Sequence, residues 1–171
     1  MLTHIHIRDF TIIDQLELDL ENGMTVLTGE TGAGKSIIID ALNLVLGDRA
    51  DSGVVRHGCA RTDISATFDI SNITAAQAWL AEQEMDAEDN SECVLRRTIT
   101  NEGRSKGYIN GSAAPIQSLQ ALGDKLVDIH GQHEHQSLLK NDMQRQLLDD
   151  YVGNANLLTQ LASIYRQWKA V

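Results

Sequence analysis

Apolar and polar residues alternate in two runs near the start of the chain, at 4–8 and at 16–21. A period of two residues predicts strands with one buried face, and two neighbouring runs predict an antiparallel hairpin. The dipeptide at 22–23 is Asn-Gly, which is a tight-turn signal. The apolar segment 24–28 that follows this turn predicts a short buried strand.

The middle of the chain carries both helix and strand signals. Residues 35–46 have the apolar spacing of a helix buried on more than one side, and Gly47 is placed to end it. The polar segment 48–61 is typical of a loop, and the acidic stretch 82–92 should face solvent. Further strands are expected at 63–70, 93–99, 105–109 and 126–129, and further helices at 74–83, 118–122 and 142–151.

The last apolar residues are spaced as in a coiled-coil seam. Their separations of 4, 3, 4 and 3 residues are the a/d pattern of a heptad repeat. Two heptads are fewer than the roughly three or four that identify a coiled coil by themselves. Because the pattern continues to the last residue, we expect the chain to be cut within a longer helix. The seam consists of Leu157, Leu161, Ile164, Trp168 and Val171.

Composition narrows the class of protein. The chain has 24 acidic and 14 basic residues, a net charge of −10, which argues against nucleic-acid binding by a surface that is basic overall. No apolar run approaches the roughly 18 residues of a membrane span, and no secretory signal or disulfide framework is present. We therefore expect a cytoplasmic protein without membrane association. A local basic patch stays compatible with the charge, and its candidates are Arg96, Arg97, Arg104 and Lys106.

Residues 29–36 read GETGAGKS and satisfy the phosphate-loop pattern G-x-x-x-x-G-K-[ST]. The motif follows a predicted strand and opens a predicted helix, which is the context that it requires. Its glycines let backbone N–H groups point at phosphate oxygens. Lys35 would reach the β- and γ-phosphates, and the Ser36 hydroxyl would bind Mg²⁺. The predicted nucleotide-binding residues are Gly29, Glu30, Thr31, Gly32, Ala33, Gly34, Lys35 and Ser36.

A phosphate loop indicates nucleotide binding but not the reaction. Hydrolysis also needs an acidic residue at the end of a buried strand and a group that orients the attacking water. Asp128 follows residues too polar for a central strand, and Asp48 follows a helix, so neither is convincing. Gln132 could contact Mg²⁺ and the water, although an ordinary loop glutamine is the simpler interpretation of its position. The three histidines within 130–135 lack the spacing of a standard zinc site.

Arginines in the predicted loop at 48–61 are candidates for binding phosphate. Arg49 and Arg56 could contact DNA phosphates or the nucleotide. A solvated loop without a ligand explains the same residues equally well. The residues alone leave both interpretations open.

Several segments resemble ATPase heads of the SMC and ABC type. The general resemblance lies in Ile5–Phe10 and in the phosphate loop with Thr28 before it. A narrower similarity, to a family of bacterial DNA repair proteins with such heads, covers nearly the whole chain. It is carried by GDRAD at 47–51, VRHG at 55–58, YING at 108–111 and VDIHGQHEHQ at 127–136.

The resemblance implies an α/β fold. This chain would be the N-terminal lobe of a P-loop ATPase head, with a mixed sheet that has an antiparallel portion and leads into the start of a coiled coil. In such proteins the head is split in sequence, and a long antiparallel coiled coil joins its halves. Residues 1–140 would form the N-terminal half of the head, and residues 141–171 the helical exit and the first turns of the coil.

The resemblance also assigns roles to individual residues. Gln132 becomes the glutamine of the Q-loop, which acts in catalysis with Lys35 and binds Mg²⁺ together with Ser36. Arg56 falls where related heads carry an arginine that contacts DNA or nucleotide, and Arg49 is a second candidate. The implied cofactors are ATP and Mg²⁺.

The implied function is ATP-dependent recombinational repair of DNA double-strand breaks. The sequence contains no Ser-Gly-Gly-[Glu/Gln] signature, no Walker B strand and no switch histidine. In the family these belong to the C-terminal half of the head, so this chain alone should hydrolyse ATP weakly or not at all. Its implied partners are that C-terminal half, a second head that engages when ATP binds, and DNA.

Two other functions remain open at this stage. The chain could be a self-contained P-loop kinase or GTPase that uses Asp128 to hold Mg²⁺, but it lacks the guanine-specific Asn-Lys-x-Asp motif and lid arginines. It could also be a non-catalytic coiled-coil interaction module whose nucleotide site is structural.

Overall fold

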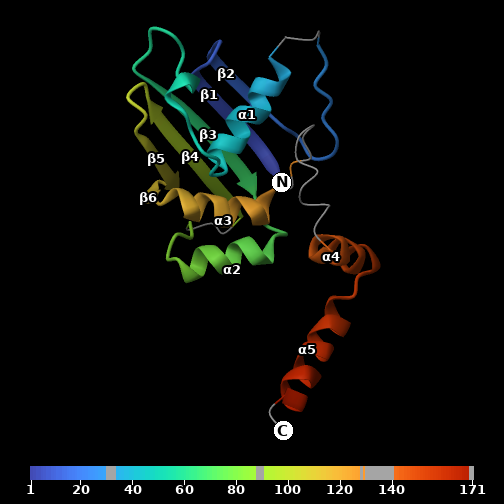
Figure 1. Ribbon diagram of the computed structural model, residues 1–171. Helices are drawn as coiled ribbons and strands as arrows, with labels where there is room; N and C mark the ends of the chain where they lie inside the picture. The colour runs from blue at the N-terminus through green and yellow to red at the C-terminus, as the bar shows by residue number, and fades with distance from the viewer. Residues whose placement is uncertain (30–33, 88–90, 128, 130–140, 170–171) are drawn as a thin grey trace. The chain divides into compact units, whose positions relative to one another are not determined.

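The computed structural model describes residues 1–29, 34–87, 91–127, 129 and 141–169 (Figure 1). The chain divides into two compact units, residues 1–128 and residues 129–171. Whether the functional boundary lies at 140, as the resemblance implies, stays a prediction. No helix in the described part of the chain is long and apolar enough to cross a bilayer.

The first unit is built on one six-stranded sheet. Its strands are β1 (Leu2–Phe10), β2 (Ile13–Asp19), β3 (Arg61–Asp69), β4 (Glu92–Thr100), β5 (Ser105–Ile109) and β6 (Ser112–Ala114). Their order is β2-β1-β3-β4-β5-β6, and every neighbouring pair is antiparallel. The predicted opening hairpin is confirmed, because Ile5 pairs with Leu18 of β2 on one side and with Ala66 of β3 on the other.

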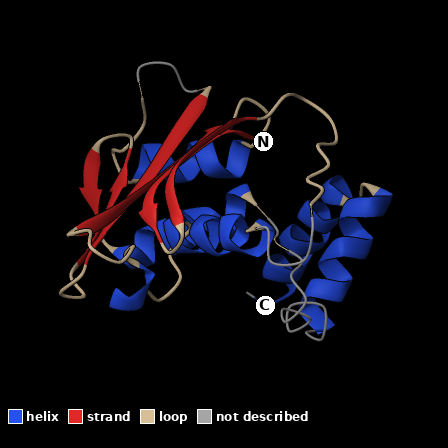
Figure 2. Cartoon of the chain, turned by 90° about the horizontal axis from the view of Figure 1, so that it is seen from above, coloured by secondary structure: helices blue, strands red, loops and turns tan. Residues whose placement is uncertain are grey.

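Helices cover one face of this sheet (Figures 1 and 2). In the first unit these are α1 (Lys35–Val45), α2 (Thr74–Glu82) and α3 (Ile116–Leu126), and a short 3₁₀ helix, η1 (Ser52–Val54), lies in the loop after α1. α1 packs on β3 and β4, α3 packs on β5, and α2 packs on α3. The predicted helices are confirmed, although α3 extends beyond both ends of the predicted segment 118–122.

The core lies between the sheet and its helices. Along β3 the inward-facing Ile64, Ala66 and Phe68 are fully buried, whereas the outward-facing Asp63 and Ser65 keep contact with solvent. This alternation is the two-residue period of a strand with one covered face. Other strand residues buried in the same core are Ile5, Ile7, Cys93, Leu95, Ile99 and Ile109, and its helical members include Ala41, Leu44, Val45, Leu119 and Leu122.

A tight turn extends the sheet by one short strand that the sequence analysis did not predict. Asn110 and Gly111 have φ values of 47° and 83°, both in the left-handed region. Two successive left-handed residues form the type I′ turn that suits the twist of a β-hairpin. The turn joins β5 to β6, whose Ala113 pairs with Tyr108.

The second unit contains two helices, α4 (Asn141–Val152) and α5 (Ala155–Lys169), in its described part. The predicted helix at 142–151 is therefore confirmed. The a/d residues of α5 that are described all face solvent, with Leu157, Leu161, Ile164 and Trp168 between 62% and 71% exposed. Val171, the last residue of the predicted seam, lies outside the described residues.

The predicted buried strand at 24–28 is wrong for this chain. The segment has no regular secondary structure, and its side chains are open to solvent: Met24 is 93% exposed, Val26 72% and Leu27 50%. A strand forms only where a neighbour takes up its backbone N–H and C=O groups. The antiparallel sheet does not include 24–28, so the expected parallel portion of a mixed sheet is not seen in the described residues.

Two other predictions need correction. The strand expected at 126–129 is wrong, because Leu126 is the last residue of α3 and Val127 and Ile129 belong to no strand. The helix after the phosphate loop is buried on one side, since Ala41, Leu44 and Val45 are its buried residues while Ile39 is 46% exposed. An apolar side chain shows that a position can be buried. It is buried only if another helix or strand packs over it.

Candidate functional site

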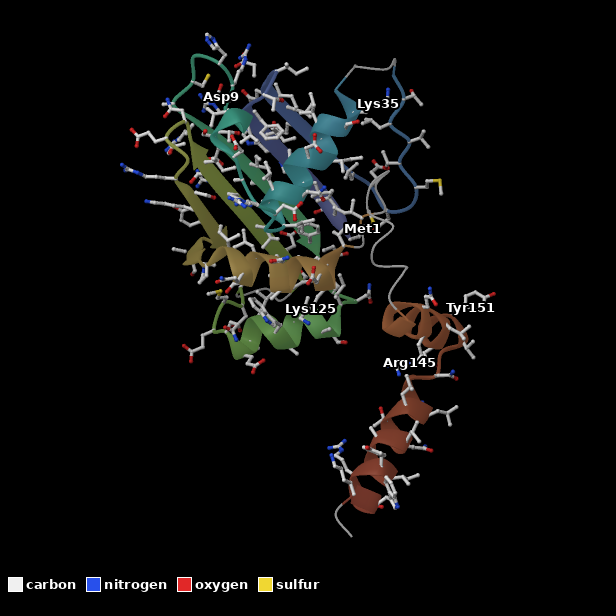
Figure 3. All side chains as sticks on the ribbon, viewed as in Figure 1. Met1, Asp9, Lys35, Lys125, Arg145 and Tyr151 are labelled. Carbon is white, nitrogen blue, oxygen red and sulfur yellow. The ribbon has the colours of Figure 1, made fainter. Side chains whose placement is uncertain are left out.

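The two described ends of the phosphate loop lie close together at the start of α1. Gly34 has φ 83° and ψ 5°, and its carbonyl accepts a hydrogen bond from Ile37 N at 3.1 Å. Lys35 begins the helix (Figure 3). Its ammonium donates to the carbonyl oxygen of Gly29. The lysine of the motif thus contacts its first glycine. The residues between them, Glu30, Thr31, Gly32 and Ala33, lie outside the described residues.

The first turn of α1 is suited to an anion. Gly34 offers no side-chain cap, and the first turn contains no acidic residue. The leading N–H groups of a helix lack partners within the helix and carry the positive end of its dipole. With Lys35 and the exposed hydroxyl-bearing Ser36 in the same turn, these groups can bind phosphate oxygens.

The other residues considered for hydrolysis are not brought to Lys35 by the described structure. Asp48 and Arg49 follow the C-terminal end of α1, and a helix of 11 residues is about 16 Å long. Arg49 lines an open depression there together with Gln117 and Gln120. Asp128, Gln132 and the histidines within 130–135 lie outside the described residues, so their roles stay predictions. In the described part of the chain no cluster of His, Cys, Asp and Glu could hold a metal ion.

Arg56 lies beside the turn that joins β1 to β2. Its guanidinium pairs with the Asp14 carboxylate at 2.6 Å, and its backbone N–H donates to Asp9 O at 2.9 Å. The side chain remains partly exposed. Arg56 also lines a depression with Cys59 and Ala60, two residues that line the neighbouring depression on the sheet.

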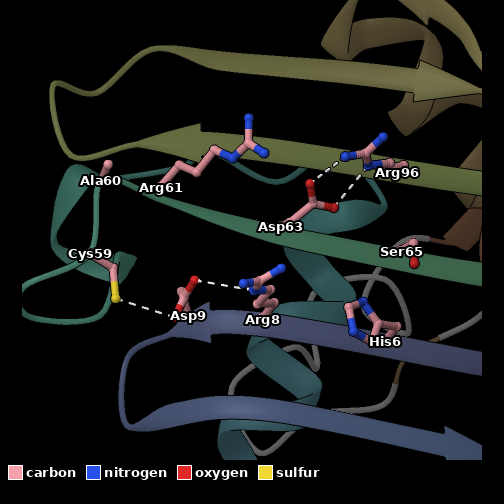
Figure 4. A pocket seen from close by; sticks show the side chains of 9 residues that line it. All are labelled: His6, Arg8, Asp9, Cys59, Ala60, Arg61, Asp63, Ser65 and Arg96. Atoms are coloured by element: carbon pink, nitrogen blue, oxygen red, sulfur yellow. Dashed lines mark hydrogen bonds and ion pairs between the residues drawn. The ribbon is translucent and has the colours of Figure 1, made fainter.

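Cationic side chains gather on the outer face of the sheet, the face opposite α1 and α3. Two adjoining depressions of about 580 and 240 Å³ lie there and share Arg61 and Arg96. Figure 4 shows the residues that line the larger of these two. The first is lined by side chains of β1, β3 and β4 with the loop before β3, and the second continues over β4 and β5. The cationic residues of this outer face are Arg8, Arg61, Arg96, Arg104 and Lys106.

Arg96 is held in place at the centre of the outer face. Its Nε donates to Asp63 Oδ1 at 2.9 Å and a terminal nitrogen donates to Oδ2 at 2.5 Å. Its guanidinium carbon lies 5.8 Å from the centre of the Tyr108 ring, within reach of a cation–π interaction. The hydrogen bonds to Asp63 raise the pKa of Arg96, so the side chain stays charged. Ion pairs with Asp63, Asp9 and Glu102 offset the charges of Arg96, Arg8 and Arg104. The excess of positive charge is therefore local to the two depressions, where Arg61 and Lys106 add to it.

Arg97 does not belong to the basic surface cluster in which the sequence analysis placed it. It is 2% exposed and points into the core, because it is the next residue after the outward-facing Arg96 on the same strand. Its Nε donates to Ser105 Oγ at 2.9 Å, and a terminal nitrogen donates to the carbonyl oxygens of Leu44, at 2.5 Å, and Asp48. Burial lowers the pKa of Arg97, and the charge of Asp48 opposes that shift.

The two thiols of the chain are both hard to ionise. Cys59 donates a hydrogen bond to Asp9 Oδ1 at 3.2 Å, and this bond to a carboxylate raises the pKa of the thiol. Burial in the core raises the pKa of Cys93 to about 12. Neither thiol is therefore suited to act as a nucleophile near neutral pH.

Residues 4–169 match the model of a protein family described as an AAA domain. The chain belongs to this AAA domain family. The match spans both compact units, from β1 to the end of α5. Membership of the family agrees with the predicted phosphate loop and with its position at the start of α1.

Curated relatives of this AAA domain chain carry the name DNA repair protein RecN. The protein of that name from Vibrio cholerae is 48% identical over 99% of the chain, and that from Haemophilus influenzae is 46% identical over 99%. The RecN of Bacillus subtilis is 43% identical over 90% of the chain. The predicted resemblance to a bacterial DNA repair family is thereby confirmed as a resemblance to RecN. The chain spans about 30% of the length of the first two relatives.

Solved structures similar to the AAA domain chain include SMC head domains. The Smc head domain of Pyrococcus furiosus with an extended coiled coil, bound to the C-terminal domain of ScpA, has a TM-score of 0.67 at 20% identity, covering 99% of this chain and 46% of that one. A structure from work on ATP-driven dimerisation and DNA-stimulated activation of SMC ATPases has a TM-score of 0.60 at 19% identity, with 88% and 98% covered. The predicted SMC-type head fold is therefore confirmed.

Proposed function

We propose that this chain is the N-terminal, ATP-binding part of an SMC-like ATPase that acts in recombinational repair of DNA double-strand breaks. The observation that carries the proposal is the exposed apolar segment 24–28 leading directly into the phosphate loop. In P-loop folds the strand before this loop lies inside a largely parallel sheet that is covered on both faces. Here the large apolar side chains of the segment, Met24, Val26 and Leu27, are 50% to 93% exposed. The other strands of that sheet would therefore come from another segment.

The nucleotide site would use the residues that the motif supplies. Backbone N–H groups of Gly29, Glu30, Thr31, Gly32, Ala33 and Gly34 and of the first turn of α1 would bind the phosphates of ATP, and Lys35 would pair with the β- and γ-phosphates. Ser36 and Gln132 would hold Mg²⁺, which neutralises charge on the phosphates when bound. The chemistry fits, because the first turn of α1 has no acidic residue to repel a nucleotide and presents Lys35 and Ser36 together.

The missing portion would be the C-terminal half of the same head. It would contribute the strands beside 24–28 and the Walker B and signature segments, which this chain lacks. A second complete head would then engage across bound ATP, so that one head's phosphate loop faces the other's signature segment. This arrangement would also cover Ile39 of α1, an apolar residue that is 46% exposed in this chain.

DNA would contact the outer face of the sheet. Five cations lie on or beside the two depressions there, although the chain as a whole has a net charge of −10. Contacts of Arg and Lys with DNA phosphates need such a local patch, not a basic protein. Arg56 lies near this face through the shared lining residues Cys59 and Ala60, so it is the better placed of the two loop arginines, and Arg49 would contact DNA only elsewhere. Such a protein would work on nucleoid DNA in the bacterial cytoplasm.

The first test is ATP binding and turnover by this chain, compared with Lys35→Ala. We expect a fluorescent ATP analogue to bind the chain, binding to weaken by about 100-fold or more in the variant, and turnover to stay far below an ordinary enzyme rate of about 1 s⁻¹. Adding the C-terminal half of the head should then raise turnover. Rapid turnover by the chain alone, lost in Lys35→Ala, would instead show a complete site and favour the kinase or GTPase interpretation.

A non-catalytic interaction module is the second candidate, because the seam residues of α5 are exposed. The discriminating observation is self-association or partner binding that is the same in Lys35→Ala as in the unmodified chain, together with no ATP-dependent turnover after the C-terminal half is added. Turnover that appears only with both halves and only with Lys35 present would reject this candidate.

A further inference from the structure

One buried cation in the first unit has no part in the proposed ATP or DNA contacts. Along β4 the inward-facing residues are Cys93, Leu95, Arg97 and Ile99, and Arg97 is the charged one among them. A buried guanidinium is costly unless its N–H groups find acceptors. Its position in a packed core therefore calls for a specific role.

Two acceptors of Arg97 lie at the C-terminal end of α1. One terminal nitrogen donates to the carbonyl oxygens of Leu44, in the last turn of the helix, and Asp48, in the turn after it, while Nε is held by Ser105 Oγ of β5. Helix C-termini carry unpaired carbonyl groups and the negative end of the dipole, which a cation stabilises. α1 has no basic residue of its own in its last turn, so Arg97 supplies this charge from β4.

The same end of α1 also packs with unusually little space. A Cβ on Gly47 would come within 2.7 Å of Gln120 N, and a Cβ on Gly123 would come within 2.9 Å of Leu46 O. Two glycines thus let α3 approach the end of α1 at backbone distance. Together with the hydrogen bonds of Arg97, these contacts fix the C-terminal end of the helix.

The opposite end of α1 carries the phosphate-binding residues. Lys35 and Ser36 stand at the first two positions of an 11-residue helix, about 16 Å from the fixed end. A tilt of about 5° at the fixed end would move them by about 1.4 Å. Displacements of about 1 Å in a reactive site can cost about 100-fold in rate.

We propose that Arg97 is a positioning residue for the nucleotide site, which sets the orientation of α1 and thereby places Lys35 and Ser36 against the phosphates. The proposal rests on the proposed ATP-binding function. Because Arg96 on the outer face is the preceding residue of the same strand, β4 also links the cationic face directly to the anchored end of α1.

The experiment compares Arg97→Met, which keeps the volume but loses the hydrogen bonds, with Arg97→Lys, which keeps one charged donor. Two readouts are made on the folded chain: amide hydrogen exchange across 35–45 without nucleotide, and the Kd of a fluorescent ATP analogue. We expect Arg97→Met to speed exchange in α1 by at least about tenfold and to weaken binding by about 10- to 100-fold. Arg97→Lys should restore part of both.

Leu95→Met is the matched control, a volume-conserving change at the neighbouring inward-facing position of β4, and it should leave both readouts as they are. Folded Arg97→Met with unchanged exchange in α1 and unchanged Kd would overturn the proposal. So would faster exchange spread evenly over the sheet with an unchanged Kd, which is the result of a purely structural role. If Arg97→Met does not fold, the same two readouts on Arg97→Lys decide the question.

Lys35→Ala separates this proposal from the proposed function. If the unmodified chain and Lys35→Ala show the same weak response to the ATP analogue, the ATP-binding function fails. The hydrogen-exchange measurement still decides whether Arg97 anchors α1, because it is made without nucleotide.

Discussion

Large apolar side chains are buried in one region of the first unit and exposed to solvent in another. In the core, Ile64 and Phe68 have no solvent-exposed surface, whereas in the segment before the phosphate loop Val26 is 72% and Leu27 50% exposed. Neighbouring strands and the helices α1, α2 and α3 enclose the core, but the described part of the chain contains nothing that encloses 24–28. The difference shows that the first unit encloses one core by itself. Under the proposed function, 24–28 would form one side of a second core.

The largest expected difference between the two regions is in folding stability. Phe68→Ala should lower the free energy of unfolding by about 3–5 kcal/mol, because it leaves a cavity in a closed core. Val26→Ala, the matched truncation in the open region, should change it by no more than about 0.5 kcal/mol. Urea denaturation followed by circular dichroism measures both. A loss of more than about 1 kcal/mol in Val26→Ala would mean that 24–28 packs against the rest of the chain in solution and is not open to solvent.

Two glycines with nearly the same backbone conformation lie in a packed and in an open part of the first unit. Gly47 has φ 117° and Gly23 has φ 114°, so an alanine is strained at either position. A Cβ at Gly47 would also meet the backbone of Gln120, whereas a Cβ at Gly23 meets nothing within 4 Å. We expect Gly47→Ala to cost about 2–4 kcal/mol and Gly23→Ala about 1 kcal/mol by thermal or urea unfolding. Equal costs would show that the α1–α3 junction is looser than described.

The smallest effect on stability is expected on the outer face, where the packing is polar. Lys106→Ala should change the free energy of unfolding by no more than about 0.5 kcal/mol, yet it should lower the salt dependence of DNA binding by about one phosphate contact. Lys125→Ala removes the same charge from the exposed side of α3 and serves as the control (Figure 3). Equal changes in salt dependence for the two variants would mean that binding is diffuse and does not use the outer face.

Most strands and helices were predictable from the sequence, because their apolar spacing reports the face that each buries. The alternation at 4–8 and 63–70 was sufficient to place β1 and β3, and GETGAGKS was sufficient to place the start of α1. The same reasoning predicted a buried strand at 24–28, which is wrong for this chain. The spacing of apolar residues shows that a segment can be buried, but it does not show which strands lie beside it. At Leu126 an apolar helix end was taken for a strand because short apolar runs fit both.

The candidate site was predictable in part. Gly29 and Lys35, the described ends of the phosphate loop, are in hydrogen-bond contact, and the phosphate-binding roles of the motif stay predictions. Arg97 was grouped with the surface cations from its charge, although its parity with Leu95 and Ile99 on β4 places it inward. Arg97 is two residues after the buried Leu95, and the two-residue period of a strand would have predicted its burial. The outer face could not be predicted, because it joins residues of β1, β3, β4 and β5 that only the sheet order brings side by side.

The high pKa values of both native thiols have a practical consequence for spectroscopy. At pH 7 a thiol with a pKa near 12, such as Cys93, has a thiolate fraction of only about 10⁻⁵. The hydrogen bond to Asp9 raises the pKa of Cys59, which also lowers the reactivity of that thiol. A cysteine introduced at the exposed Leu27 would therefore react with a maleimide dye ahead of the two native ones. Because the native thiols react slowly, a single fluorophore can be attached at this position. It would lie on the segment where a second half of the head would dock, so its signal would report that docking directly.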